Sequence, residues 1–228
     1  MIRVILWDID GTLLDFAAAE REAIRGCFAA FGLGACTDQM LARYSVINRQ
    51  YWEKLERKEL TKPQVLIGRF EVFFAEEGLV ADCVAFNDEY QIRLGDTVCF
   101  HDDGFALVQQ LKGRVRQYAV TNGTKIAQQR KLHNSGLDAL LDGVFISEDI
   151  GVEKPGVEFF HSVWETIGPY EPDEVLIVGD SLTSDMQGGN NAGIRCCWYN
   201  PKGAPAPEHL KIDYNIRDLR EILAILEQ

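Results

Sequence analysis

Four short polar clusters in this sequence combine carboxylates with a lysine, a threonine and an asparagine. They are Asp8-Ile9-Asp10-Gly11-Thr12, Thr121-Asn122-Gly123, Lys154-Pro155 and Gly179-Asp180-Ser181, the last followed by Asp185. Carboxylates that lie close together repel one another unless a cation neutralises them, and oxygen ligands without histidine or cysteine suit Mg²⁺. Lysine and free backbone N–H groups bind phosphate oxygens. If the clusters meet in the fold, they predict a divalent cation beside a phosphate, as phosphoryl transfer requires.

Short apolar runs precede these clusters and predict the strands that position them. Five runs are β-branched or aromatic and end at a polar or turn signal: 3–7, 117–120, 144–147, 175–178 and 195–198. A weaker sixth run covers 214–216. Such runs are typical of buried parallel strands, and ligands bind beyond the carboxyl ends of parallel strands. We therefore expect all four clusters to converge on one edge of the sheet.

Helical patterns alternate with most of the runs, at 104–111, 125–135, 157–167, 183–192 and 219–226. Strand–helix alternation of this kind predicts an α/β fold with helices on both faces of the sheet. Between the first two runs, however, lie about 110 residues with almost no strand signal, far more than a crossover connection needs. Their apolar spacing predicts four helices, near 16–31, 38–57, 62–77 and 81–93. We interpret this segment as a helical domain inserted after the first strand.

In order and spacing, the four clusters resemble the motifs of the haloacid dehalogenase (HAD) superfamily, in its phosphatase branch. The resemblance implies a Rossmann-like HAD core with a parallel sheet flanked by helices, plus an inserted all-α cap domain of four helices, of the C1 type. It also implies a Mg²⁺-dependent phosphomonoesterase that acts through an aspartyl-phosphate intermediate. With these boundaries, residues 1–15 and 97–228 form the core and residues 16–96 form the cap.

The resemblance assigns catalytic roles to residues of the first three clusters. Asp8 would be the nucleophile, and Asp10 the general acid and base. Thr121 and Lys154 would hold the phosphoryl oxygens, with Asn122 beside them. An aspartate nucleophile splits one difficult displacement into two easier steps, and a second carboxylate can protonate the leaving oxygen. A dehalogenase lacks that second carboxylate, so the presence of Asp10 argues against dehalogenase chemistry.

The resemblance also implies a metal site. Asp8, Asp180 and the backbone carbonyl of Asp10 would bind Mg²⁺, and Asp185 would orient the groups around the metal.

A narrower resemblance links the chain to the HAD pyrimidine 5′-nucleotidases. It rests on residues 46–52 and 68–73 of the insert and on residues 120–123, 146–155 and 185–193 of the core. It implies that nucleoside 5′-monophosphates are the substrates. Another small phosphomonoester, such as a sugar phosphate or phosphoglycolate, is the alternative, and a catalytically idle HAD-fold binding module is an alternative of another class.

The insert is the main candidate for substrate recognition, because the catalytic clusters would bind only the phosphate and the metal ion. We expect Asn48 to hydrogen-bond the leaving group and Tyr51 to stack on it. Trp52 and Phe70 could also stack on a base or could be core residues, and Arg69 could contact the substrate or pair with acids of the cap. The links near residues 13–15 and 94–101 would let the cap open and close.

The amino-acid composition narrows the classes of binding partner that the chain could have. The 228 residues include 35 acidic and 23 basic ones, which gives a formal charge of −12. So acidic a chain lacks the basic surface that nucleic-acid polymers and anionic membranes require, and no apolar run is long enough to cross a bilayer. The six cysteines include no CxxC pair, as expected for free thiols in a reducing compartment. We therefore expect a cytoplasmic enzyme with a small-molecule substrate and no obligate protein partner.

Overall fold

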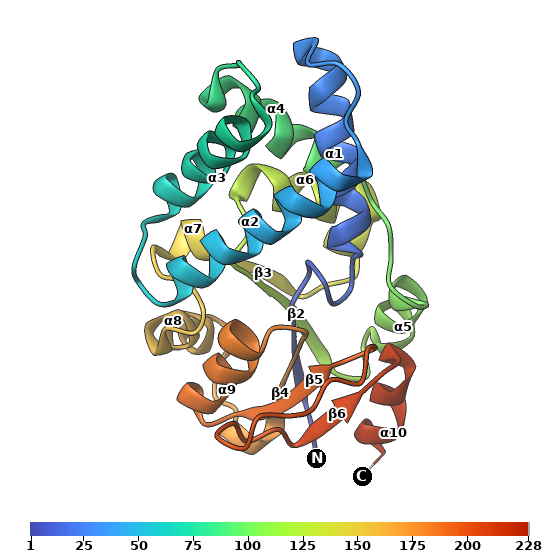
Figure 1. The fold of residues 1–228 in the computed structure, drawn as a ribbon. Helices are drawn as coiled ribbons and strands as arrows, with labels where there is room; N and C mark the ends of the chain where they lie inside the picture. The colour runs from blue at the N-terminus through green and yellow to red at the C-terminus, as the bar shows by residue number, and fades with distance from the viewer. Residues whose placement is uncertain (228) are drawn as a thin grey trace.

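The computed structural model describes residues 1–227 and is built around one parallel sheet (Figure 1). Its six strands lie in the order β3-β2-β1-β4-β5-β6. Their bounds are Val4–Trp7 (β1), Arg116–Thr121 (β2), Gly143–Ile146 (β3), Val175–Gly179 (β4), Arg195–Tyr199 (β5) and Tyr214–Ile216 (β6). All neighbouring strands pair in parallel, which confirms the predicted sheet, including its weak sixth strand.

Both faces of the sheet are covered by helices, because successive side chains of each strand point to opposite faces. Ile5 and Trp7 of β1 belong to the core under α5, α6 and α10, whereas Val4 and Leu6 belong to the core under α8 and α9. The bounds of these helices are Gly104–Leu111 (α5), Lys125–Ser135 (α6), Val157–Ile167 (α8), Gln187–Ala192 (α9) and Ile222–Leu226 (α10). Short helical turns cover Leu137–Ala139 (η1), Ser147–Ile150 (α7), Pro172–Glu174 (η2), Leu182–Met186 (η3) and Leu219–Glu221 (η4).

Four inserted helices lie beyond the carboxyl ends of the strands (Figure 1). They are Phe16–Phe31 (α1), Asp38–Glu56 (α2), Lys62–Glu77 (α3) and Cys83–Asp96 (α4), here called the cap helices. Local signals set several of their ends: Asp15 caps the first turn of α1 and Thr37 that of α2. Their interior is aromatic, with Tyr44 stacked on Phe70 at 5.2 Å and Phe86 edge-on to Phe70. Phe70 is therefore a core residue of the cap.

The cap helices pack directly on helix α6 of the core. This contact was not predicted from the sequence. Helix α4 lies along α6, and Ala127 of α6 is part of the hydrophobic cluster of the cap. A side chain at Gly95 of α4 would come within 3.1 Å of the Ala127 carbonyl oxygen, so the close helix contact depends on this glycine. Helix α4 also runs to Asp96, so Gly95 lies in the helix and not in the return link.

The two links between cap and core run side by side. The Asp15 amide donates to the Cys99 carbonyl at 2.8 Å, and the His101 amide donates to the Leu13 carbonyl at 3.0 Å. A further contact ties the cap to the core at the start of α3, where the buried Lys62 ammonium donates to the Ser147 hydroxyl at 2.8 Å. In residues 1–227, no helix combines the length and the apolar character that a membrane span needs.

Candidate active site

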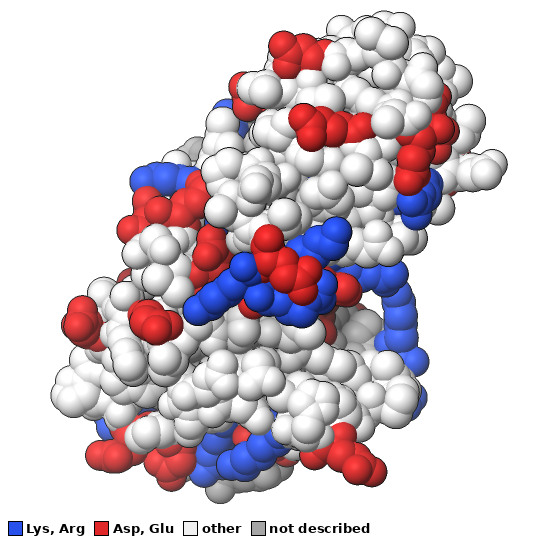
Figure 2. Space-filling model, turned by 60° about the vertical axis from the view of Figure 1, so that its left-hand side comes forward, with Lys and Arg blue, Asp and Glu red and all other residues white. Residues whose placement is uncertain are grey.

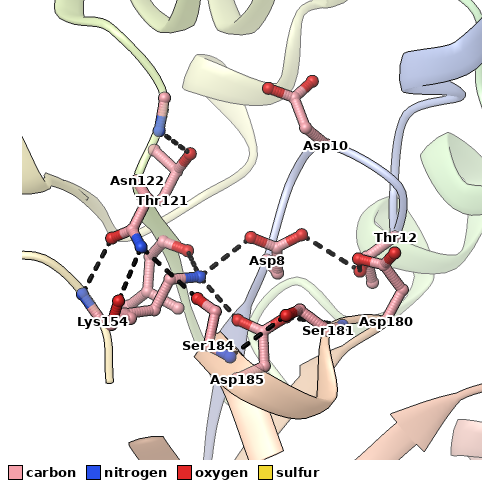
Figure 3. Close-up of polar contacts among 12 residues, drawn as sticks. Asp8, Asp10, Thr12, Thr121, Asn122, Lys154, Asp180, Ser181, Ser184 and Asp185 are labelled. Atoms are coloured by element: carbon pink, nitrogen blue, oxygen red, sulfur yellow. Dashed lines mark hydrogen bonds and ion pairs between the residues drawn. The ribbon is translucent and has the colours of Figure 1, made fainter. Parts of the chain in front are cut away.

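The four polar clusters meet at the carboxyl ends of the strands, as predicted (Figure 3). They line one cavity of about 170 Å³ between the sheet and the cap. Asp8 follows β1, Thr121 ends β2, Lys154 lies on the loop between α7 and α8, and Asp180 and Asp185 follow β4. Charged side chains of both signs form a band across the surface between the upper and lower parts of the molecule (Figure 2).

Lys154 lies at the floor of the cavity, between the carboxylates of Asp8 and Asp185. Its ammonium group donates to Asp8 Oδ1 at 2.9 Å, to Asp185 Oδ1 at 2.6 Å and to the Val120 carbonyl at 2.7 Å. Burial lowers the pKa of an ammonium group, but the Asp185 and Asp8 carboxylates outweigh it here and raise the pKa of Lys154. Lys154 is therefore a fixed positive charge.

Three carboxylates form a cluster that one lysine cannot neutralise. Oxygens of Asp8, Asp180 and Asp185 lie within 4.8 Å of one another. Burial, with repulsion from the neighbouring Asp185, raises the pKa of Asp8 well above its usual range and that of Asp180 to about 7. The Thr12 hydroxyl bridges Asp8 and Asp180, at 3.1 and 3.4 Å.

This donor set fits Mg²⁺, because it offers oxygen ligands whose mutual repulsion a divalent cation relieves. The backbone of Gly11 lies so close to Asp180 that an added Cβ would sit 2.7 Å from Asp180 Oδ2. The tight packing and the positive φ of Gly11, 96°, both require glycine at this position. The predicted ligands Asp8 and Asp180 are thus brought together, with the predicted helper Asp185 beside them.

Thr121 and Asn122 lie on the wall formed by the end of β2. The Thr121 hydroxyl accepts from the Gly123 amide at 3.1 Å. The Asn122 side chain exchanges two hydrogen bonds of 2.8 Å with the backbone of Lys154. Asn122 therefore fixes the loop that carries Lys154, and its contact with phosphate stays a prediction.

The Asp10 carboxylate is turned away from Asp8 towards helix α6 (Figure 3). It accepts from Gln128 Nε2 at 2.6 Å and forms an ion pair with Lys131. Both partners are almost fully buried. The sequence prediction missed them, although a glutamine and a lysine three residues apart on one helix share a face.

The cap contributes a different set of residues from the predicted one. Phe16, Trp52 and Glu56 line the cavity, whereas Asn48 and Tyr51 do not. Asn48 is buried inside the cap, where its amide donates to Glu20 at 2.8 Å and accepts from Arg69 at 2.7 Å. Tyr51 lies against Gly68 of α3. The structure therefore gives no support to direct contact of Asn48 or Tyr51 with the leaving group.

Glu56 stands near the end of α2, where the cap meets the core. One of its carboxylate oxygens is buried and has no hydrogen-bond partner among residues 1–227. Burial raises the pKa of Glu56 to about 7. A hydrogen bond with the Thr183 hydroxyl lowers this pKa, whereas the negative charge of Asp185 raises it further.

Comparison with known proteins identifies the family. Residues 2–193 match the family model of haloacid dehalogenase-like hydrolases. The chain belongs to this family. It is 37% identical to the HAD-hydrolase YfnB of Bacillus subtilis over 224 residues, which cover 98% of this chain and 95% of YfnB. The crystal structure of YfnB bound to magnesium superposes with a TM-score of 0.92 at 36% identity, covering 100% of this chain and 99% of that one.

Two further relatives of this HAD hydrolase have nucleotidase names. The pyrimidine 5′-nucleotidase PynA of Streptococcus pneumoniae is 32% identical, over 99% of this chain and 95% of PynA. The pyrimidine 5′-nucleotidase YjjG of Escherichia coli is 28% identical, over 97% of this chain and 96% of YjjG. The resemblance drawn from the sequence is thus confirmed for the family and agrees with these names.

Proposed function

We propose that this HAD hydrolase is a Mg²⁺-dependent phosphomonoesterase that removes the phosphate of pyrimidine nucleoside 5′-monophosphates. The observation that carries the proposal is the position of Asp8 at the cavity floor, with Lys154 at 2.9 Å and the Asp180 and Asp185 carboxylates within 4.8 Å. An idle binding module would gain nothing from crowding three carboxylates, because crowding destabilises the fold.

In the first step, a carboxylate oxygen of Asp8 attacks phosphorus and the bond from phosphorus to the leaving oxygen breaks. The Asp8 oxygen becomes bonded to phosphorus, and Asp10 donates a proton to the leaving oxygen. Lys154 and Thr121 hold the phosphoryl oxygens while this happens. Lys154 also offsets the repulsion between the anionic nucleophile and the anionic phosphate.

In the second step, Asp10 takes a proton from a water molecule that attacks the same phosphorus. The bond between phosphorus and Asp8 breaks, which releases inorganic phosphate and restores the Asp8 carboxylate. Asp8 and Asp180 would hold Mg²⁺ together with the Asp10 carbonyl, and Asp185 would orient them. The bound ion would supply positive charge that stabilises the transferring phosphoryl group.

For this chemistry, Asp10 must exchange partners during the cycle. In the structure its carboxylate faces Gln128 and Lys131, and both oxygens are engaged. We infer that substrate draws Asp10 towards the leaving oxygen, and that residues 16–96 act as a cap over the core formed by 1–15 and 97–228. The paired links at Asp15 and His101 would serve as the hinge.

The nucleotide preference is supported by the names of PynA and YjjG and by aromatic residues over the cavity. The test is phosphate release with Mg²⁺ from UMP, CMP, AMP, ribose 5-phosphate and phosphoglycolate, ranked by kcat/KM. We expect the pyrimidine nucleotides to rank first, and Asp8→Asn to abolish release while leaving the melting temperature close to that of the wild type. A sugar phosphate or phosphoglycolate turned over tenfold better than UMP would overturn the nucleotide assignment, and full activity of Asp8→Asn would overturn the mechanism.

A further inference from the structure

One buried lysine of the cap reaches into the core. Lys62 is the first residue of α3, and its side chain is only 8% exposed. Its ammonium group donates to the Ser147 hydroxyl at 2.8 Å and lies 3.7 Å from a Glu148 oxygen and 3.9 Å from a Glu153 oxygen. Ser147 begins α7, which lies beside the start of α3 (Figure 1). Lys62 therefore joins the inserted helices to a turn of the core.

The turn that Lys62 contacts leads directly to Lys154. Residues 147–153 connect the end of β3 to Lys154, and Glu153 is the residue immediately before it. Ser147 is buried at the start of this segment, and the Asn122 side chain holds the backbone of Lys154 at its end. The segment is thus held by the cap at one end and by the core at the other. A movement of the cap would reach Lys154 through these few residues.

Stability alone does not account for a lysine in this place. Burial lowers the pKa of the Lys62 ammonium, although the charges of Glu148 and Glu153 act in the opposite direction. Both glutamates are about one-third exposed, at 31% and 29%, so water solvates them without Lys62. Apolar residues in place of a buried ion pair are often neutral or stabilising. A buried ammonium that must meet Ser147 is better suited to fixing one position of the cap on the core.

A second lysine reaches the same turn from the core side. Lys125 is the first residue of α6, and its ammonium group pairs with Asp149 at 2.5 Å. Its backbone amide donates to Glu148 at 2.7 Å. The Lys125 side chain is about half exposed, and α6 and α7 both belong to the core. Of these two lysines, only Lys62 contacts the turn from the cap.

We propose that Lys62 is a positioning residue of this enzyme, which couples the position of the cap to the placement of Lys154 through Ser147. With the cap on the core, the ammonium group holds Ser147 and steadies the segment that ends at Lys154. When the cap lifts, Lys62 becomes hydrated and the segment loses this support. The inference rests on the proposed function and adds to it the contact through which the cap acts on the phosphate-binding lysine.

The experiment replaces Lys62 by methionine, which has a similar length and no charge. We expect the Kd for inorganic phosphate, measured by titration calorimetry with Mg²⁺, to rise about tenfold, since a hydrogen bond to a charged group is worth at least about this factor. The values of kcat/KM for UMP and 4-nitrophenyl phosphate should fall by the same factor, because both substrates carry the phosphoryl group that Lys154 holds. Thermal unfolding shows that each variant is folded at the assay temperature.

Two further variants locate the effect. Ser147→Ala removes the acceptor of the Lys62 hydrogen bond and should weaken phosphate binding at least about threefold. The double variant should bind phosphate no more weakly than Lys62→Met, because both substitutions break the same contact. Lys125→Met is the matched control, since this lysine pairs with the same turn from within the core. It should leave the phosphate Kd and kcat/KM unchanged.

The outcomes separate the positioning role from a role in stability. A lower melting temperature of Lys62→Met with an unchanged phosphate Kd and unchanged kcat/KM overturns the proposal, as does an equal loss in Lys125→Met. Losses that multiply in the double variant overturn the route through Ser147. Absence of phosphate release from both substrates by the wild type overturns the proposed function, and the calorimetric Kd values then decide the role of Lys62 without turnover.

Discussion

Replacing Lys154 by methionine should destabilise the metal-free protein strongly. The lysine is buried and is the only cation within hydrogen-bond reach of Asp8 and Asp185 among residues 1–227, at 2.9 and 2.6 Å. Breaking a buried ion pair by removing one partner costs about 3–5 kcal/mol, because a charge is left without compensation. For a chain of this size, that predicts a melting temperature about 6–20 °C lower.

The assay is thermal unfolding in EDTA, with Lys62→Met as the matched control. Lys62 is also buried and donates to Ser147, but its nearest carboxylates, Glu148 and Glu153, lie at 3.7 and 3.9 Å and are partly exposed. Removing the Lys62 ammonium should therefore lower the melting temperature clearly less than removing that of Lys154. A melting temperature for Lys154→Met equal to that of Lys62→Met would refute the view that Lys154 neutralises the acidic cluster.

The same variant should respond to pH in a defined direction. Lys154 lowers the pKa of Asp8, which burial has already raised, so its removal raises that pKa further. A carboxyl whose folded-state pKa is raised destabilises the fold when ionised, and protonation relieves this cost. The stability deficit of Lys154→Met should therefore shrink as the pH falls. A deficit that grows towards acid would contradict the assignment.

Three further predictions concern the acid groups around the cavity. The pKa of Asp180 is about 7 in the metal-free fold, against an ordinary value of 3.8, so the folded state binds a proton between about pH 4 and 7 that the unfolded state lacks. Metal-free stability should thus fall as the pH rises through this window, and the gain in melting temperature from Mg²⁺ should grow; a gain independent of pH would contradict this. Asp10→Asn should lower kcat about 10²–10⁴-fold for UMP and less for 4-nitrophenyl phosphate, whose leaving group needs less protonation; equal losses would remove the general-acid role. Glu56, with a pKa of about 7, should ionise above that pH and repel the substrate phosphate, so KM should rise there in the wild type and stay flat in Glu56→Gln; parallel profiles would exclude Glu56 as the cause.

The sheet and the acidic cluster were predictable because local sequence sets both. Each strand is a short apolar run, and Asp8, Thr121 and Asp180 stand at the end of a strand or directly after it. Parallel pairing then brings the strand ends together without any further information. Helix lengths in the cap were also predictable, because apolar spacing and N-caps such as Thr37 are local signals.

The contacts between cap and core were not predictable, because they depend on how the inserted helices dock on the rest of the chain. Asn48 was expected at the substrate because it lies in a stretch of the insert, residues 46–52, that resembles the pyrimidine 5′-nucleotidases, yet its side chain points into the cap, to Glu20 and Arg69. Trp52 and Glu56, one and two turns further along α2, line the cavity instead. Residues four apart lie on nearly the same helix face, so the position along α2 at which the cavity begins separates these residues, and the docking of the inserted helices on the core sets that position.

The inward position of Asn48 makes it part of a buried polar network of the cap. Its carbonyl oxygen accepts from Arg69 Nη1, and its amide donates to Glu20, whose other oxygen accepts from Ser45. Arg69 is in turn held by two uncharged side chains, Asn48 and Asn87. The residue first expected to contact the leaving group thus orients a buried guanidinium inside the cap. Because a buried charge is costly unless it is hydrogen-bonded, this network of amides is what lets Arg69 lie within an otherwise aromatic interior.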